Sequence, residues 1–117
     1  MSSPKPHFTP ARRAGDFIYV SGQLPFDAAM QIVDGGIETQ TRACIDHISR
    51  ALESVGSSLA MVVKNMVWLT DPADFPVFNR TYAEYFPEEP PARATVGTTL
   101  MVPGALIEIE AIAYDPL

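Results

Sequence analysis

Apolar residues recur at helical spacing in two stretches of the chain. Residues 39–55 carry them three or four positions apart, which predicts an amphipathic helix that ends near Gly56. A second helix is expected after Asp74, which can cap it, with Pro76 in its first turn. Aromatic side chains repeat every three or four positions along it: Phe75, Phe78, Tyr82, Tyr85 and Phe86.

Four β-prone stretches complete the pattern, over residues 17–22, 61–70, 93–99 and 106–114. In the stretch 106–114, positions that are all apolar alternate strictly with positions that include two glutamates. A turn at residues 102–104 joins this stretch to the stretch 93–99. The order of strand, helix, strand, helix, strand, strand predicts one α+β domain over residues 1–117, with helices layered on a sheet.

Composition narrows the classes of function. The 117 residues include 8 Lys or Arg against 14 Asp or Glu, and the net charge of −6 argues against a nucleic-acid partner. A single cysteine, Cys44, and two histidines make an intramolecular disulfide impossible and a zinc site improbable. No signal peptide or membrane span is evident, so we expect a cytoplasmic protein without a membrane partner.

Candidate chemistry lies in the last two strands. Alternation puts Glu108 and Glu110 on one face of the final strand, and Arg93 opens the preceding one. If these strands pair through the turn, Arg93 and one glutamate share a cleft where a guanidinium grips a carboxylate and a carboxylate activates water. A cross-strand ion pair on a solvated face fits the same pattern, and periodicity alone does not choose between the two.

Four sequence blocks resemble the signatures of the reactive-intermediate deaminase family (RidA/YjgF): YVSGQLP at 19–25, NRTYAEYF at 79–86, PARATV at 91–96 and IEIEAIA at 107–113. The resemblance runs nearly end to end. It implies a chorismate-mutase-like α+β fold, with a mixed sheet and two helices on one face, assembled as a homotrimer with clefts between subunits. The implied activity is hydrolysis of enamines and imines, such as those from 2-aminoacrylate, to 2-keto acids and ammonia, without a metal or organic cofactor.

The resemblance also assigns roles to residues. Arg93 matches the arginine that binds the substrate carboxylate, Glu108 matches the acid that positions water, and Glu110 is a bystander. Five more residues are expected to contact the substrate: Ser21, Gly22, Asn79, Thr95 and Phe8.

Phe8 and Thr95 stand where better-known members carry a tyrosine and a cysteine, and the loop at 87–91 is shorter than theirs. These departures leave the range of substrates open. The alternative to an enzyme is a non-catalytic trimer that binds small carboxylates or, like a chaperone, client proteins. Nucleic-acid cleavage, a third class, is disfavoured by the negative charge.

A trimer is also expected on physical grounds, because the sheet would otherwise leave an apolar face in water. The residues expected on that face are Val20, Val63, Val67, Ile107 and Ile109.

Overall fold

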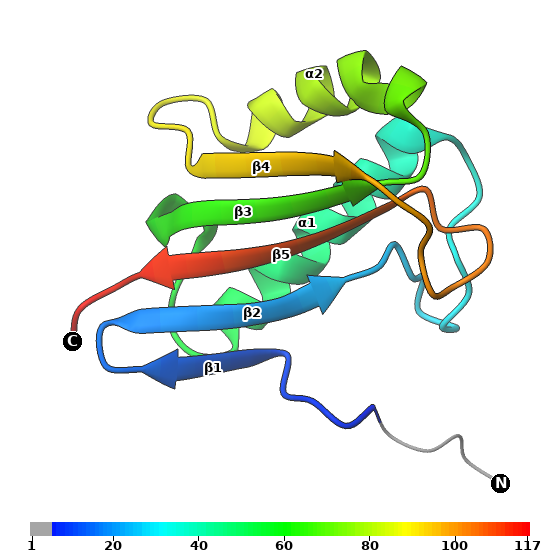
Figure 1. Cartoon of the computed structure of the whole chain (residues 1–117). Helices are drawn as coiled ribbons and strands as arrows, with labels where there is room; N and C mark the ends of the chain where they lie inside the picture. Colours follow the sequence, from blue (N-terminus) through cyan, green and yellow to red (C-terminus); the bar gives the residue numbers. More distant parts are fainter. Residues whose placement is uncertain (1–5) are drawn as a thin grey trace, which may run out of the picture.

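The computed structural model describes residues 6–117 as one sheet covered on one side by two helices (Figure 1). The strands are β1 (Ala11–Ala14), β2 (Phe17–Gln23), β3 (Val62–Leu69), β4 (Ala92–Gly97) and β5 (Ile107–Tyr114). The helices are α1 (Ile37–Glu53) and α2 (Phe75–Tyr85), and short 3-10 turns at Leu59–Met61 and Pro72–Asp74 precede β3 and α2. No helix within residues 6–117 is both long and apolar enough to cross a membrane.

The predicted helices and four predicted strands are confirmed, with ends that move by about two residues. Gly56, with φ +82°, lies in the turn that terminates α1, where the amide of Ser57 donates to the carbonyl of Leu52 at 2.9 Å. Asp74 precedes α2 as expected but makes no side-chain cap. Instead, the Asp71 carboxylate accepts from the amide of Ala73 at 2.9 Å and caps the 3-10 turn.

The first strand, β1, was not predicted. Its four residues, two of them arginines, are too short and polar to give a strand pattern. A two-residue turn at Gly15 and Asp16 folds it back on β2 so that Ala14 faces Phe17, and Gly15 supplies the positive φ of 61° that such a turn needs. The Arg13 guanidinium then donates to the Asp115 carbonyl at 2.7 Å.

The sheet order is β1-β2-β5-β3-β4, so β4 and β5 do not pair. The pairing through the turn at 102–104 that a cleft shared by Arg93 and a glutamate would require is therefore not formed. β4 pairs with β3 in parallel, and α2 is the crossover connection that a parallel pair requires. β5 pairs with the other edge of β3 in antiparallel, so β3 lies between β4 and β5. The loop before β5 instead passes the end of β3, where the Thr70 amide donates to the Leu106 carbonyl at 3.0 Å.

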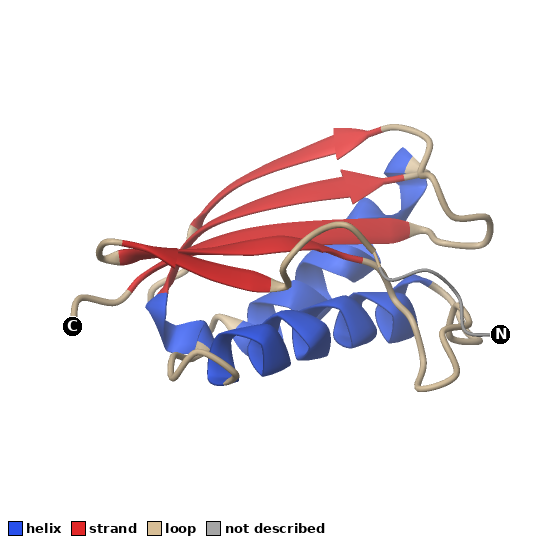
Figure 2. Ribbon diagram, turned by 90° about the horizontal axis from the view of Figure 1, so that it is seen from below, coloured by secondary structure: helices blue, strands red, loops and turns tan. Residues whose placement is uncertain are grey.

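Both helices lie against the same face of the sheet (Figure 2). Burying one large aliphatic side chain in this layer contributes about 1.5–3 kcal/mol. The fully buried aliphatic residues are Ile18, Ile45, Ile48, Leu52, Val67, Ile107 and Ile109.

The apolar face invoked above for trimer formation is thus already covered within one chain. Val20, Val67, Ile107 and Ile109 are at most 3% exposed beneath the helices, and only Val63 stays open at 43%. By the alternation along three strands, the face without helices instead exposes other large residues: Phe17, Tyr19, Val96 and Tyr114.

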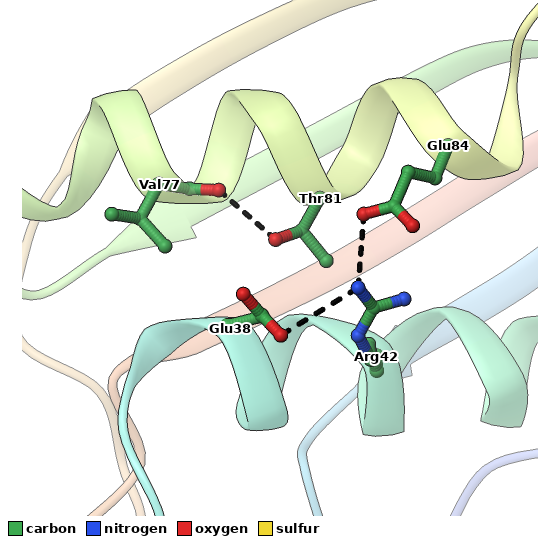
Figure 3. A network of polar contacts seen from close by, with 5 residues as sticks. All are labelled: Glu38, Arg42, Val77, Thr81 and Glu84. Carbon is green, nitrogen blue, oxygen red and sulfur yellow. Dashed lines mark hydrogen bonds and ion pairs between the residues drawn. The ribbon is translucent and has the colours of Figure 1, made fainter.

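Charged side chains link the two helices at the surface. Figure 3 shows Arg42 of α1 between Glu38, at 3.6 Å, and Glu84 of α2, at 2.9 Å. The same view shows Thr81 bonded back to the Val77 carbonyl within α2. Both glutamates are about 60% exposed, so these ion pairs contribute little and the apolar layer holds the helices in place.

A buried polar residue, Gln40, fixes the loop that leads into β5. It is 3% exposed; its amide Nε2 donates to the Gly104 carbonyl at 3.1 Å, and its Oε1 accepts from the Leu106 amide at 2.7 Å. One α1 side chain therefore satisfies two backbone groups of the loop, two residues before Glu108.

We predict that Gln40→Ala lowers the free energy of unfolding by about 1–3 kcal/mol, because it leaves those backbone groups without their partner. Urea unfolding followed by circular dichroism measures the change. The exposed Gln31, whose side chain makes no hydrogen bond within residues 6–117, supplies the control, and Gln31→Ala should stay within about 0.5 kcal/mol of the parent. Equal losses would contradict the bridging role.

Candidate functional site

Arg93 lies on the edge strand β4, with its side chain directed toward α2. Its guanidinium carbon lies 5.6, 5.2 and 4.8 Å from the ring centroids of Phe75, Phe78 and Tyr82. Within residues 6–117 the guanidinium makes no side-chain hydrogen bond or ion pair. Aromatic rings therefore hold this cation, and its N–H donors stay open to a ligand.

A hollow of about 350 Å³ opens beside Arg93 and is walled by α2 and the loop that follows it. Predicted Asn79 and Arg93 both line it, so the structure brings these two residues together. Thr95 lies two positions along β4, on the same face as Arg93, and does not line this hollow. Its Oγ1 is buried and has no hydrogen-bond partner within residues 6–117.

Tyr82 is a further member of this cluster, which the sequence indicates only as part of the aromatic repeat along the second helix. The Asn65 Nδ2 donates to its hydroxyl oxygen at 2.7 Å, and Asn65 is fully buried directly across from Arg93 on β3. Burial raises the pKa of Tyr82 against the opposing effects of Asn65 and Arg93, so the phenol stays neutral. A strand-to-helix hydrogen bond thus fixes the ring nearest Arg93.

Glu108 lies on β5 and makes no side-chain hydrogen bond or ion pair within residues 6–117. Partial burial, and secondarily the charge of Glu110, raise the pKa of its carboxyl group. Gly22 of β2 lies against it so closely that a Cβ there would collide with Oε2. Predicted Gly22 and Glu108 are therefore direct neighbours, and the missing side chain makes room for the carboxylate.

Glu108 borders two hollows. The larger, about 600 Å³, has a mostly apolar wall and includes predicted Phe8 and Gly22. Its other large apolar residues are Leu24, which lies within the YVSGQLP block, and Phe26 and Met30, which closely follow it. The sequence patterns gave none of the three a role in the site. The smaller hollow, about 380 Å³, lies between Trp68 and the loop after β4.

Predicted Ser21 holds the segment that carries Phe8. Its hydroxyl donates to the Thr9 carbonyl at 2.6 Å, and its amide donates to the Pro10 carbonyl at 2.9 Å. It lines a third hollow, about 680 Å³, that also includes Phe8.

The two predicted catalytic residues lie on opposite faces of the sheet. Asn65 is the register partner of Arg93, and Trp68 is the register partner of Glu108. Asn65 and Trp68 are three positions apart on β3, and an odd separation along a strand reverses the face. Within one chain, neither the shared cleft nor the cross-strand ion pair can form.

The remaining candidate side chains are engaged inside the fold. His47 lines the larger Glu108 hollow; its Nδ1 accepts from Arg50 at 2.9 Å, so Nε2 donates to the Phe26 carbonyl at 2.7 Å. Cys44 is fully buried, which raises the pKa of its thiol, and its Sγ lies 3.7 Å from the Ile107 carbonyl. Across residues 6–117, no three His, Cys, Asp or Glu side chains are placed to hold a metal.

Comparisons with known proteins identify the family of the chain. The family model described as Endoribonuclease L-PSP matches residues 2–115. A protein named 3-aminoacrylate deaminase RutC, from Acinetobacter baylyi, is 44% identical over 112 residues, covering 95% of this chain and 89% of the relative. A RutC family protein from Pyrococcus horikoshii is also 44% identical, over 97% of this chain and 92% of its own.

Solved structures of RidA and YjgF proteins have the same fold as this chain. RidA from an Antarctic Psychrobacter species is 35% identical and superposes with a TM-score of 0.88, covering 96% of this chain and 91% of its own. The YjgF gene product of Escherichia coli is 31% identical with a TM-score of 0.85, covering 92% and 87%.

The raised pKa of Glu108 predicts that Glu108→Gln stabilises the fold at pH 7. A carboxyl whose pKa is higher in the folded than in the unfolded state loses stability as pH rises between the two values. The gain from Glu108→Gln should therefore shrink as pH falls to and below about 4.3, the pKa of an unfolded glutamate, because the parent carboxyl then becomes protonated in both states. Urea unfolding at pH 7 and pH 4 measures it, with Glu89→Gln, in an exposed loop, as the control. A destabilised Glu108→Gln at pH 7 would contradict the desolvation of this carboxylate.

Proposed function

Because the chain belongs to the Endoribonuclease L-PSP family, which includes RidA, YjgF and RutC proteins, we propose that it is an enamine and imine deaminase. Its substrates are reactive 2-imino acids, such as those that arise from 2-aminoacrylate, and its products are 2-keto acids and ammonia. Arg93 binds the carboxylate and Glu108 positions the water. The non-catalytic, carboxylate-binding module remains the alternative.

The state of Arg93 is the observation that carries this proposal. Its guanidinium is held by three rings and forms no ion pair with any carboxylate of residues 6–117, so a planar pair of donors is available to a substrate carboxylate. Asn79 borders the same hollow and offers an amide to the ligand.

Glu108 acts as the general base that activates the water. Its carboxylate accepts a proton from water as the water oxygen bonds to the imine carbon. The proton is then given to nitrogen. As the C–N bond breaks, the hydroxyl gives its remaining proton to the Glu108 carboxylate, which passes it on to the departing ammonia, and a 2-keto acid is left. A raised pKa suits this exchange because it brings the carboxyl closer to the working pH. The bond to be broken is already polarised in a protonated imine, so orientation supplies much of the remaining catalysis.

We infer that two copies of the chain contribute to each site, because one copy carries Arg93 and Glu108 on opposite faces of its sheet. We propose a homotrimer in which the exposed sheet faces meet and each cleft takes Arg93 from one subunit and Glu108 from the next. The exposed Phe17, Tyr19, Val96 and Tyr114 supply apolar area for such contacts.

Nuclease activity, which the description of the family model names, fits this chain less well. A net charge of −6 repels a polyanion. In addition, Glu108 and Glu110 share the sheet face without helices, where a phosphate backbone would need cations.

We predict that Glu108→Gln lowers kcat for imine hydrolysis by about 10²–10⁴, because the water loses its base. Glu110→Gln should retain turnover, but its pH profile should shift to lower pH, since Glu110 helps to raise the pKa of Glu108. Imines generated in solution from amino acids by an oxidase, and followed by the loss of their absorbance, provide the assay. Equal losses of kcat in the two variants would refute the assignment of Glu108.

A mixing experiment tests whether two subunits share the site. Arg93→Ala and Glu108→Gln proteins should each be nearly inactive alone. After the two are unfolded together in equal amounts and refolded, about a quarter of the parent activity should return, because each mixed trimer contains one cleft with both native residues.

Light scattering of the parent should give about three times the chain mass of 12.8 kDa. No recovery on mixing, with trimers intact, would show that the site does not combine Arg93 and Glu108 from neighbouring subunits. A monomer at micromolar concentration would remove the shared cleft altogether.

A further inference from the structure

The aromatic rings around Arg93 form a continuous row along one face of α2. Phe75, Phe78 and Tyr82 are spaced by three and four residues, and consecutive centroids lie 6.1 and 5.4 Å apart. Phe78 and Tyr82 are at most 5% exposed, whereas Phe75 is 39% exposed at the start of the row. The guanidinium of Arg93 lies within 6 Å of all three centroids, the range in which a cation is attracted to a ring.

We propose that Phe75, Phe78 and Tyr82 are a platform that positions Arg93 for a ligand carboxylate without neutralising it. The inference rests on the proposed role of Arg93 as the carboxylate-binding residue. Tyr82, which has the closest ring, is its principal positioning residue.

The physical reason is that stacking and hydrogen bonding use different parts of a guanidinium. An aromatic ring attracts the cation electrostatically and takes no N–H donor. A carboxylate partner would hold Arg93 equally well, but it would occupy two donors and cancel the charge that must attract the substrate. A ring platform orders the side chain in advance, which lowers the entropy cost of binding.

A second arginine of the same chain shows the contrast. Arg42 also lies beside a tyrosine of α2, with its guanidinium carbon 6.0 Å from the ring of Tyr85. Unlike Arg93, it contacts two carboxylates, those of Glu38 and Glu84. One helix thus carries two arginine–tyrosine contacts, one neutralised by acids and one left with open donors.

A hydrogen bond from Asn65 on the sheet holds the Tyr82 ring of the platform in place. Asn65 is fully buried on β3 and donates to the Tyr82 hydroxyl at 2.7 Å, while its register partner on β4 is Arg93 itself. Strand, helix and edge strand are therefore connected through Tyr82. The position of the ring is set by the sheet that also sets the backbone of Arg93.

The test measures binding of 2-oxobutanoate, an unreactive carboxylate, and of its uncharged amide by calorimetry on the full-length protein. Tyr82→Leu should weaken 2-oxobutanoate binding about tenfold and narrow the preference for acid over amide. Tyr82→Phe, which restores the ring without the hydroxyl, should recover most of this affinity. Tyr85→Leu makes the same chemical change beside Arg42 and should bind like the parent.

Unchanged affinity in a folded Tyr82→Leu protein overturns the proposal, and so does an equal loss in Tyr85→Leu. If Tyr82→Leu does not fold, Phe75→Leu carries the test, since Phe75 is partly exposed; a loss of a few-fold supports the platform and no loss overturns it. A parent that binds 2-oxobutanoate through Arg93 yet hydrolyses no imine leaves the platform standing and refutes the deaminase activity alone.

Discussion

The parallel pairing of β3 with β4 is the constraint on which the candidate site depends. Parallel neighbours need a crossover, and α2 is that crossover. Its position brings a row of aromatic rings over the edge strand, where Arg93 lies among them. The same pairing places β3 between β4 and β5, and the register then assigns Arg93 and Glu108 to opposite faces. One topological feature thus orders the cation and separates it from the acid.

The sequence predicts local structure better than strand order. Helical spacing locates α1 and α2 because each helix buries one stripe, and alternation locates β5 because one face is covered. β1 has no such signal, since its pairing depends on a turn and a neighbouring strand. Adjacency in sequence led to the wrong pairing of β4 with β5, because loop length and apolar pattern do not reveal that β3 lies between them.

The sequence likewise predicts individual residues of the candidate site but not how they are grouped in space. The sequence blocks locate Arg93, Asn79, Gly22 and Glu108, and the structure groups them into two pairs of neighbours. Asn65 could not be found in this way, because a single buried amide within an apolar strand carries no periodic signal. Its importance appears only when the register places it opposite Arg93 and beneath Tyr82.

The wall of the larger Glu108 hollow is built in part from outside the sheet. Phe8 belongs to a segment that precedes β1 and is held to β2 by hydrogen bonds from Ser21 to the backbone of Thr9 and Pro10. Backbone carbonyls accept these bonds, so they place no demand on the neighbouring side chains. Phe8 itself is 56% exposed and lies outside the packed layer beneath the helices, so a substitution at residue 8 reshapes the cavity wall and leaves that layer intact.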